Sequence, residues 1–243
     1  MNSQACRAVG SWLAVLAAGL MVSAGCGSSS PPAGNSGRLG FASPSMSGGH
    51  LPVPEATLSA EDRAWEVFQA SRAGDWEAAM GCYGALATDV KHIPRTADNA
   101  DLIARVEATL RDLHDAIYVH DMPSAMNFSN DITALTALLA DPYRKEVPTE
   151  AKMLAFYARR LEIFVMSADL RELRESATQM GVYWQQLRPL VVARHATTLA
   201  DEFGTTVART LNAQQVTDFI PLVAPAQQQA DAIDLLFRTT EED

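Results

Sequence analysis

The side chains best suited to bind a metal lie together in one short stretch of the sequence. His114, His120, Met122 and Met126 combine imidazole and thioether donors, a soft set that copper accepts. A structural interpretation competes with this one, because His120 occupies a turn and Met122 falls on the apolar face of the helix that follows. We favour the structural interpretation and predict neither a bound metal nor a cofactor.

The rest of the chain offers no recognisable catalytic motif. GxSxG, HExxH, CxxC, CxxCH, GxGxxG and Walker-type sequences are all missing, and no ExxH pair of the di-iron kind is present. Asp89 and His92 lie one helical turn apart near Pro94, which is typical of a surface pair. Cys82 follows acidic residues rather than the cationic ones that activate a thiol. We therefore expect that the protein is not an enzyme.

The third of four predicted helical hairpins contains a group of aromatic residues, Tyr157, Phe164, Tyr183 and Trp184. The four rings follow helical spacing, and at such positions aromatic side chains usually fill the core. They are also able to line a pocket between helices, and this alternative stays open.

The charge balance excludes one large class of partner. The 243 residues contain 19 Lys+Arg and 29 Asp+Glu, which gives a formal net charge of −10 at pH 7. Nucleic acids and anionic lipid surfaces attract cationic proteins, so we expect no nucleic-acid partner. The hydrophobic fraction of 48% is ordinary for a globular protein and excludes a chain that is disordered throughout.

The N-terminus has the features of a secretory signal peptide. Residues 1–25 carry a single charge, at Arg7, and an apolar run extends from Trp12 to Val22. Such a run is too short to span a bilayer, which requires about 20 residues. We therefore predict that residues 1–25 are removed and are not part of the fold.

The apolar run ends in a more specific motif, at residues 22–26. It reads Val-Ser-Ala-Gly-Cys and resembles the lipobox of bacterial lipoproteins, although Ser23 stands where that family usually has Leu. The resemblance implies that Cys26 carries lipid and becomes the first residue after cleavage. It also implies a location in the cell envelope, anchored to a bacterial membrane, either on the outer membrane facing the periplasm or at the cell surface.

Residues 26–55 form the next predicted segment, a tether between the lipid and the body. They are rich in Ser, Gly and Pro, and their charged residues are Arg38 and Glu55. Such a segment cannot bury enough apolar surface to offset its ordering entropy, so we predict that it is disordered. Cys82 is then the one cysteine left with a free thiol, which excludes an intramolecular disulfide.

Residues 56–243 repeat a helical pattern. Apolar residues return at offsets of 1, 4, 8, 11, 15 and 18 from Asp75, Asp121, Asp169 and Gln215, with few exceptions, and these anchors are 46, 48 and 46 residues apart. The pattern predicts an all-α fold of about eight helices in four antiparallel hairpins. Heptad-like offsets favour packing into one or two helical bundles, and a short α-solenoid is the alternative.

Capping residues and breaks place the helix ends. Asp75, Asp121 and Asn212 are good N-caps, Asn212 with Gln215 suggests a capping box, and Pro189 suggests a break. The predicted helices are 59–72, 76–93, 99–119, 122–140, 150–167, 169–188, 190–211 and 214–238.

These features together favour a membrane-anchored envelope lipoprotein with a non-catalytic helical domain. We expect that domain to interact with another envelope protein or to give structural support. The alternative is a periplasmic-type helical bundle that binds a small ligand or a metal. Exposed apolar surface on the assembled helices would favour a protein partner, whereas an enclosed cavity with polar groups would favour a ligand.

Overall fold

The computed structural model describes residues 51–143 and 147–238, all of which belong to one compact unit of the chain. The predicted signal peptide, Cys26 and most of the predicted tether lie outside these residues. The described part is all-α, as the apolar spacing predicts, and contains no β-strand. Its helices are α1 (Glu55–Arg72), α2 (Trp76–His92), α3 (Ala100–Tyr118), α4 (Met122–Ala140), α5 (Thr149–Met166), α6 (Leu170–Ala193), α7 (Thr197–Asn212) and α8 (Val216–Arg238).

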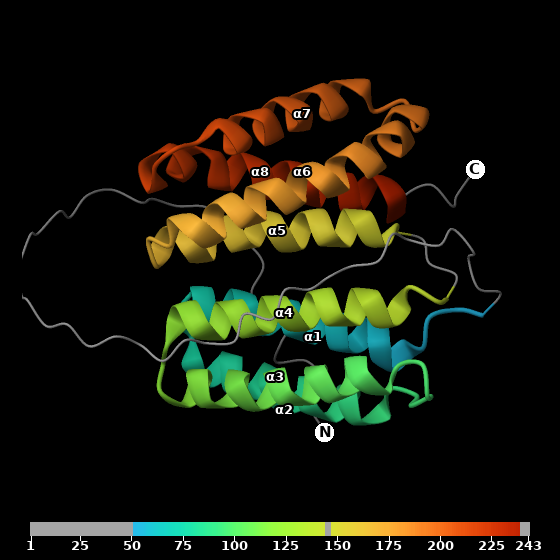
Figure 1. The fold of residues 1–243 in the computed structure, drawn as a ribbon. Helices are drawn as coiled ribbons and strands as arrows, with labels where there is room; N and C mark the ends of the chain where they lie inside the picture. The colour runs from blue at the N-terminus through green and yellow to red at the C-terminus, as the bar shows by residue number, and fades with distance from the viewer. Residues whose placement is uncertain (1–50, 144–146, 239–243) are drawn as a thin grey trace, which may run out of the picture. The chain divides into compact units, whose positions relative to one another are not determined.

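The helices close into two sets of four (Figure 1). In the first set, α1 packs against α2 and α4, and α3 packs against the same two helices. The second set repeats this plan, because α5 and α7 each pack against both α6 and α8. A solenoid would stack each hairpin on the one before it and would not close in this way. The hairpins therefore pair into two four-helix bundles, which meet where α4 and α5 lie side by side.

In three of the hairpins, the same kind of turn joins the two helices. Gly74, His120 and Ala168 each follow a helix and adopt positive φ angles of 71°, 60° and 54°. The next residue donates its backbone N–H to a carbonyl five residues back, as Asp75 does to Ala70. This arrangement is the Schellman motif, in which a left-handed residue closes the helix and satisfies its last carbonyls. The prediction that His120 occupies a turn is therefore confirmed.

An aspartate follows each of these left-handed residues and caps the next helix. The side chains of Asp75, Asp121 and Asp169 accept a hydrogen bond from the backbone N–H three residues later. Each carboxylate satisfies an otherwise unpaired donor and lies at the positive end of the helix dipole. Three of the four anchors in the sequence, Asp75, Asp121 and Asp169, therefore mark a repeated turn, in which one residue ends a helix and the next begins another.

The boundary between α6 and α7 differs from the prediction. α6 continues through Pro189 to Ala193, and the left-handed residue after it is His195, with a φ of 61°. The predicted break at Pro189 is wrong. Leu187 and Val191 flank the proline and are fully buried, so their packing holds the helix against the core despite the lost backbone hydrogen bond.

Asn212 is not an N-cap, which corrects a second predicted boundary. It is the last residue of α7, and its side-chain amide donates to the carbonyl of Ala208. The backbone N–H groups of Gln214 and Gln215 donate instead to the carboxylate of Asp218. The predicted capping box is therefore wrong, because a carboxylate from the first turn of α8 reaches back to the donors that precede the helix.

Prolines lie directly before the first helix and inside the last one. α1 begins at Glu55 rather than at residue 59, directly after Pro54, and the Glu55 side chain interacts favourably with the helix dipole. α8 runs without interruption although Pro221 and Pro225 lie inside it. The helical body therefore begins where the predicted tether ends.

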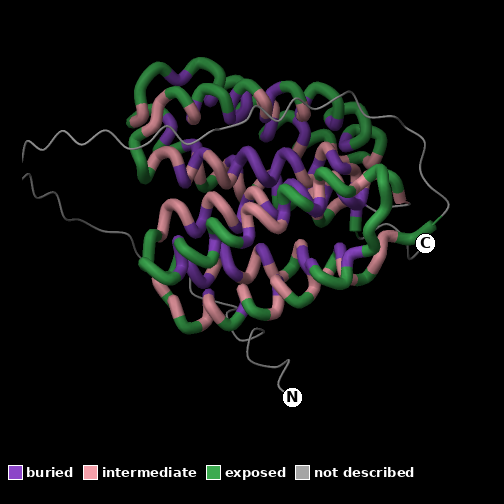
Figure 2. The backbone as a smooth tube through the Cα atoms, turned by 60° about the horizontal axis from the view of Figure 1, so that its bottom comes forward, coloured by how far each residue is buried: buried purple, intermediate pink, exposed green. Residues whose placement is uncertain are grey.

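Buried residues lie along the inner sides of the helices in both bundles, and exposed residues lie mainly on their outer sides (Figure 2). The apolar spacing identifies much of this core correctly. Trp184, for example, is buried and meets Phe203 of α7 edge-on, with ring centroids 4.9 Å apart. Other fully buried large side chains are Phe68, Leu86, Ile103, Leu113, Ile132, Phe156 and Phe219.

Ala168 provides a test of the repeated turn. A Cβ atom costs roughly 1–2 kcal/mol in the left-handed region, and glycine avoids this cost. We expect Ala168→Gly to raise the free energy of unfolding by about 0.5–1 kcal/mol, because the greater freedom of glycine in the unfolded chain offsets part of the gain. Gly74→Ala should lower it by a similar amount. Urea denaturation measures both variants, and a change of the same sign in both would contradict the shared turn geometry.

Candidate functional site

The structure divides the predicted metal ligands between two environments. Met126 is fully buried and packs with Phe68 of α1 and Ile163 of α5, and Met122 packs against the same cluster. The two thioethers therefore lie among apolar side chains where the bundles meet. Met122 packs on the apolar face, as its position in the helical pattern suggests, and Met126 is buried although it lies beside that pattern.

The two histidines lie between α2 and α3 instead. His120 stacks on Trp76 with ring centroids 4.9 Å apart. His114 contacts Tyr83 at 5.4 Å and Tyr118 at 6.4 Å. Among residues 51–143 and 147–238, no three His, Cys, Asp or Glu side chains are grouped so that they could hold a metal ion.

The five rings make two sets of contacts, Trp76 with His120 and His114 with both Tyr83 and Tyr118. We call them together the aromatic stripe: Trp76, Tyr83, His114, Tyr118 and His120. Each helix contributes residues spaced seven or four apart, which lie on one helical face. The start of α2 meets the end of α3, so the ring contacts follow the line along which the two helices adjoin. The Tyr118 side chain is 74% exposed, and the neighbouring Val119 is 68% exposed. Figure 1 shows α2 and α3 on the side of the first bundle away from α5.

The aromatic residues of the third hairpin do not form a single group. Tyr157 stacks on Tyr183 at 5.8 Å, whereas Trp184 packs against Phe203. Phe164 lies with the cluster around Met126. The four rings therefore lie in three different surroundings, with Tyr157 and Tyr183 together, and the interpretation as core residues holds for buried Tyr157 and Trp184.

The remaining residues considered in the sequence have local partners. His92 places its Nδ1 atom 2.8 Å from the carbonyl oxygen of Thr88 on the same helix. Cys82 is buried inside the first bundle. His195 closes α6 through its left-handed backbone. His92, Cys82 and His195 therefore each contribute to the helices or to a helix end.

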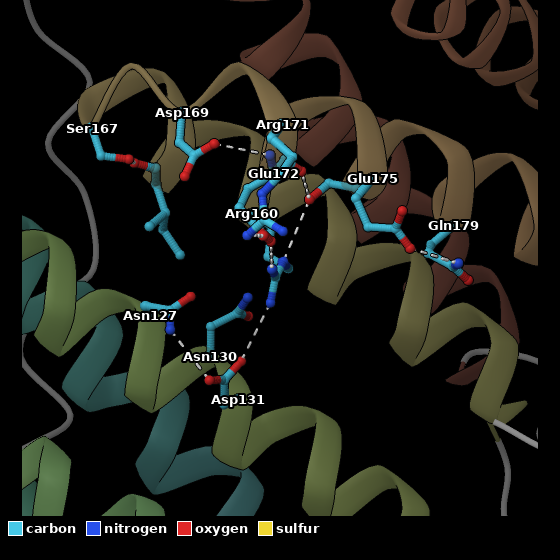
Figure 3. Close-up of polar contacts among 12 residues, drawn as sticks. Asn127, Asn130, Asp131, Arg160, Ser167, Asp169, Arg171, Glu172, Glu175 and Gln179 are labelled. Carbon is cyan, nitrogen blue, oxygen red and sulfur yellow. Dashed lines mark hydrogen bonds and ion pairs between the residues drawn. The ribbon is translucent and has the colours of Figure 1, made fainter. Parts of the chain in front are cut away.

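Sequence reasoning missed a network of charged side chains where the two bundles meet. Arg160 of α5 lies 3.7 Å from Asp131 of α4 and 2.7 Å from Glu172 of α6 (Figure 3). The Asn127 amide donates to the same Asp131 carboxylate. The Arg160 guanidinium also lies 4.6 Å from the centre of the Phe164 ring. We call Asp131, Arg160 and Glu172 the charged triad.

A second edge of α5 makes a similar set of contacts with α1 and α8. The Lys152 ammonium lies 2.6 Å from Glu61 and 3.2 Å from Asp234. Arg159 lies over the ring of Trp65, 4.8 Å from its centre. The available signal in the sequence was the presence of three basic residues, Lys152, Arg159 and Arg160, in a largely apolar helix. Because buried charges require partners, such residues indicate ion pairs with neighbouring helices. The sequence did not show which helices would supply those partners.

Burial changes the protonation behaviour of this region. Burial raises the pKa of Asp131 from 3.8 to about 6, and the positive charges of Arg160 and Arg105 oppose the rise. It lowers the pKa of Arg159 to about 10, and the carboxylate of Asp231 opposes that change. Arg159 therefore stays cationic near neutral pH, whereas Asp131 binds a proton in mildly acidic solution.

The described residues also include an open depression on α6, with a volume of about 420 Å³. Its lining comes from a single helix and includes charged side chains, among them Arg171, Arg174 and Glu175. Small-molecule sites are usually concave and mostly apolar, with a few convergent polar groups. This depression does not have that form.

Comparison of the chain with family models, curated proteins and solved structures finds no match. None of the helices within residues 51–143 and 147–238 has both the length and the apolar character needed to cross a bilayer. The charged triad and the aromatic stripe are therefore the features of the molecule that bear on its function.

We predict that Asp131 makes folding stability depend on pH. Its folded pKa of about 6 exceeds the usual 3.8, so the folded state binds this proton more tightly than the unfolded state does. This proton therefore adds to the free energy of unfolding. Its contribution is complete below about pH 4 and is lost as the pH rises through about 6. Because the side chain is 28% exposed, we expect a loss of about 1–2 kcal/mol. Asp131→Asn should therefore raise the free energy of unfolding near neutral pH and flatten its pH dependence.

Urea denaturation at a series of pH values measures this effect. Asp201→Asn serves as the control, because Asp201 lies in an exposed ion pair with Arg188 at 3.2 Å. That variant should keep the pH dependence of the unmodified protein. Parallel profiles for Asp131→Asn and the unmodified protein would contradict the raised pKa.

Proposed function

We propose that this protein is a membrane-anchored envelope lipoprotein whose helical body docks another envelope protein without catalysis. The motif at residues 22–26 supports the lipid anchor on Cys26, through its resemblance to a lipobox. The Ser/Gly/Pro-rich composition that follows supports a tether to the helical body.

The aromatic stripe is the observation on which the docking function depends. Exposed single apolar residues are common on proteins, but a contiguous group of rings is typical of an interaction surface. Aromatic side chains are also enriched in protein interfaces, where their large area contributes to binding. Tyr118 and Val119 are the two most exposed large apolar residues of α3 and the turn after it. The stripe therefore has the composition of a docking surface, and His114, Tyr118 and His120 are its exposed rings.

The contacts of α5 support a role as a stable platform. Arg160 pairs with carboxylates of α4 and α6, and Lys152 pairs with those of α1 and α8. These four partners come from both bundles, so separating the bundles would leave charges unpaired. A platform that resists deformation loses little conformational entropy when a partner docks.

A small-ligand or metal-binding function has less support. Met122 and Met126 lie in the apolar cluster, whereas His114 and His120 lie in the aromatic stripe. The four candidate ligands are thus held by different neighbours and do not converge on one point.

We predict that Cys26→Ala moves the protein from the membrane fraction to the soluble fraction of its native cells. The lipid would supply the membrane affinity, because about 0.8 kcal/mol accompanies each buried methylene group. Ser23→Leu is the matched control, because it brings the motif closer to the lipobox and should leave the protein in the membrane. Immunoblots of both fractions give the readout. Membrane association of Cys26→Ala equal to that of the unmodified protein would refute the anchor.

Docking is tested separately by photo-crosslinking in intact cells. A photoreactive phenylalanine at position 118 should give a covalent adduct with one envelope protein, identified by mass spectrometry. The same amino acid at position 235 is the control, because Leu235 is 57% exposed on α8 and lies outside the stripe. No adduct at position 118, or equal adducts at both positions, would contradict docking through the stripe.

A further inference from the structure

We infer that the aromatic stripe binds an arginine-bearing segment of its partner protein. The inference rests on the docking function proposed above and adds the chemistry of the partner. Two independent features of the surface lead to it. The first is the excess of carboxylates over basic residues in the two segments that contain the stripe. The second is the set of contacts by which this chain already holds arginine side chains between α5 and its neighbours.

The two segments that contain the stripe have an excess of carboxylates, although Arg111 lies on the same face of α3 as His114 and Asp115. Residues 75–84 and 112–121 contain the whole stripe and include no Lys or Arg. The nearest cation in these parts of the sequence is Arg111, directly before the second segment. The carboxylates of the two segments are Asp75, Glu77, Asp112, Asp115 and Asp121. A cationic segment is therefore the complementary partner for this surface.

Asp115 brings one of these carboxylates directly beside the rings. Its Oδ1 atom lies 3.2 Å from Nδ1 of His114, and its side chain is 84% exposed. Burial raises the pKa of the Tyr83 phenol, and the negative charge of Asp115 raises it further, which places this carboxylate near Tyr83 as well. A cation that stacks on the tyrosine ring would therefore have a carboxylate within reach.

The contacts of α5 show that this chain binds arginine through the same pair of groups. Arg159 lies 4.8 Å from the centre of the Trp65 ring, and Arg160 lies 4.6 Å from that of Phe164. Each guanidinium also has carboxylates nearby, such as Glu172 for Arg160. The aromatic stripe presents rings and carboxylates in the same combination, but residues 75–84 and 112–121 supply no guanidinium. The partner would supply it.

Arginine fits this surface better than lysine. Its guanidinium is planar, so it stacks on aromatic rings while its N–H groups still point towards carboxylates. The lysine ammonium is a compact and strongly hydrated charge, and it gains less from stacking. The inference therefore predicts a preference between two peptides of equal charge.

Binding of short peptides to the full-length lipidated protein in detergent micelles tests this preference. The probes are alternating glycine–arginine, glycine–lysine and glycine–glutamate peptides of equal length. We expect the arginine peptide to bind about threefold to tenfold more tightly than the lysine peptide, and the glutamate peptide not to bind. Equal binding of the arginine and lysine peptides would overturn the stacking arrangement and with it the inference.

Paired charge variants separate local recognition from the overall negative charge. Asp112→Asn combined with Asp115→Asn should weaken binding of the arginine peptide by about tenfold, and Tyr118→Ala by about fivefold. Asp101→Asn combined with Glu202→Gln removes the same charge from exposed positions on α3 and α7, and should change binding less than about twofold. Equal losses in the two double variants would overturn the inference.

The crosslinking experiment distinguishes failure of this inference from failure of the docking function. An adduct at position 118 that maps to an arginine-bearing segment of one partner supports both. An adduct that maps to an acidic or apolar segment, or to a second copy of this chain, would overturn the inference while leaving docking through the stripe intact. The absence of an adduct would overturn the docking function itself.

Discussion

The pairing of partly buried charges on α5 is the constraint on which the rest of the structure depends. Lys152, Arg159 and Arg160 are half-buried where the two bundles meet, and leaving such charges without partners there would be costly. Their carboxylate partners belong to helices of both bundles, including Glu61 on α1 and Glu172 on α6. The two bundles therefore satisfy the charges of one shared helix, and neither bundle alone would do so.

Local turn chemistry prepares the helices for this assembly. Schellman turns ahead of Asp75, Asp121 and Asp169 reverse the chain within a few residues, so each pair of helices is already antiparallel. Apolar faces then meet at α4 and α5, where Met126 packs with residues of α1 and α5. The ionic contacts surround this apolar cluster, so water is largely excluded from Arg160 and Glu172, whose side chains are only 17% and 13% exposed.

The same chemical groups have different roles inside the body and on its surface. Arg159 and Trp65 form an internal contact between α5 and α1, whereas Tyr118 of the aromatic stripe is exposed. Internal contacts fix the relative positions of the bundles, and the exposed rings are free to contact another molecule. The balance of rigid interior and open aromatic surface is what a docking platform requires.

Local chemistry explains which features were predictable from the sequence. Helix type, the caps at Asp75 and Asp121, and the turn position of His120 depend on residues within a few positions of one another. The tertiary structure decided the closure of α1 on α4, the charged triad, and the separation of His114 and His120 from Met122 and Met126. It also decided that α6 continues through Pro189, because burial of Leu187 and Val191 outweighs the cost of a proline inside the helix. Contacts between distant residues govern these features, and short-range periodicity carries no information about which distant residues will meet.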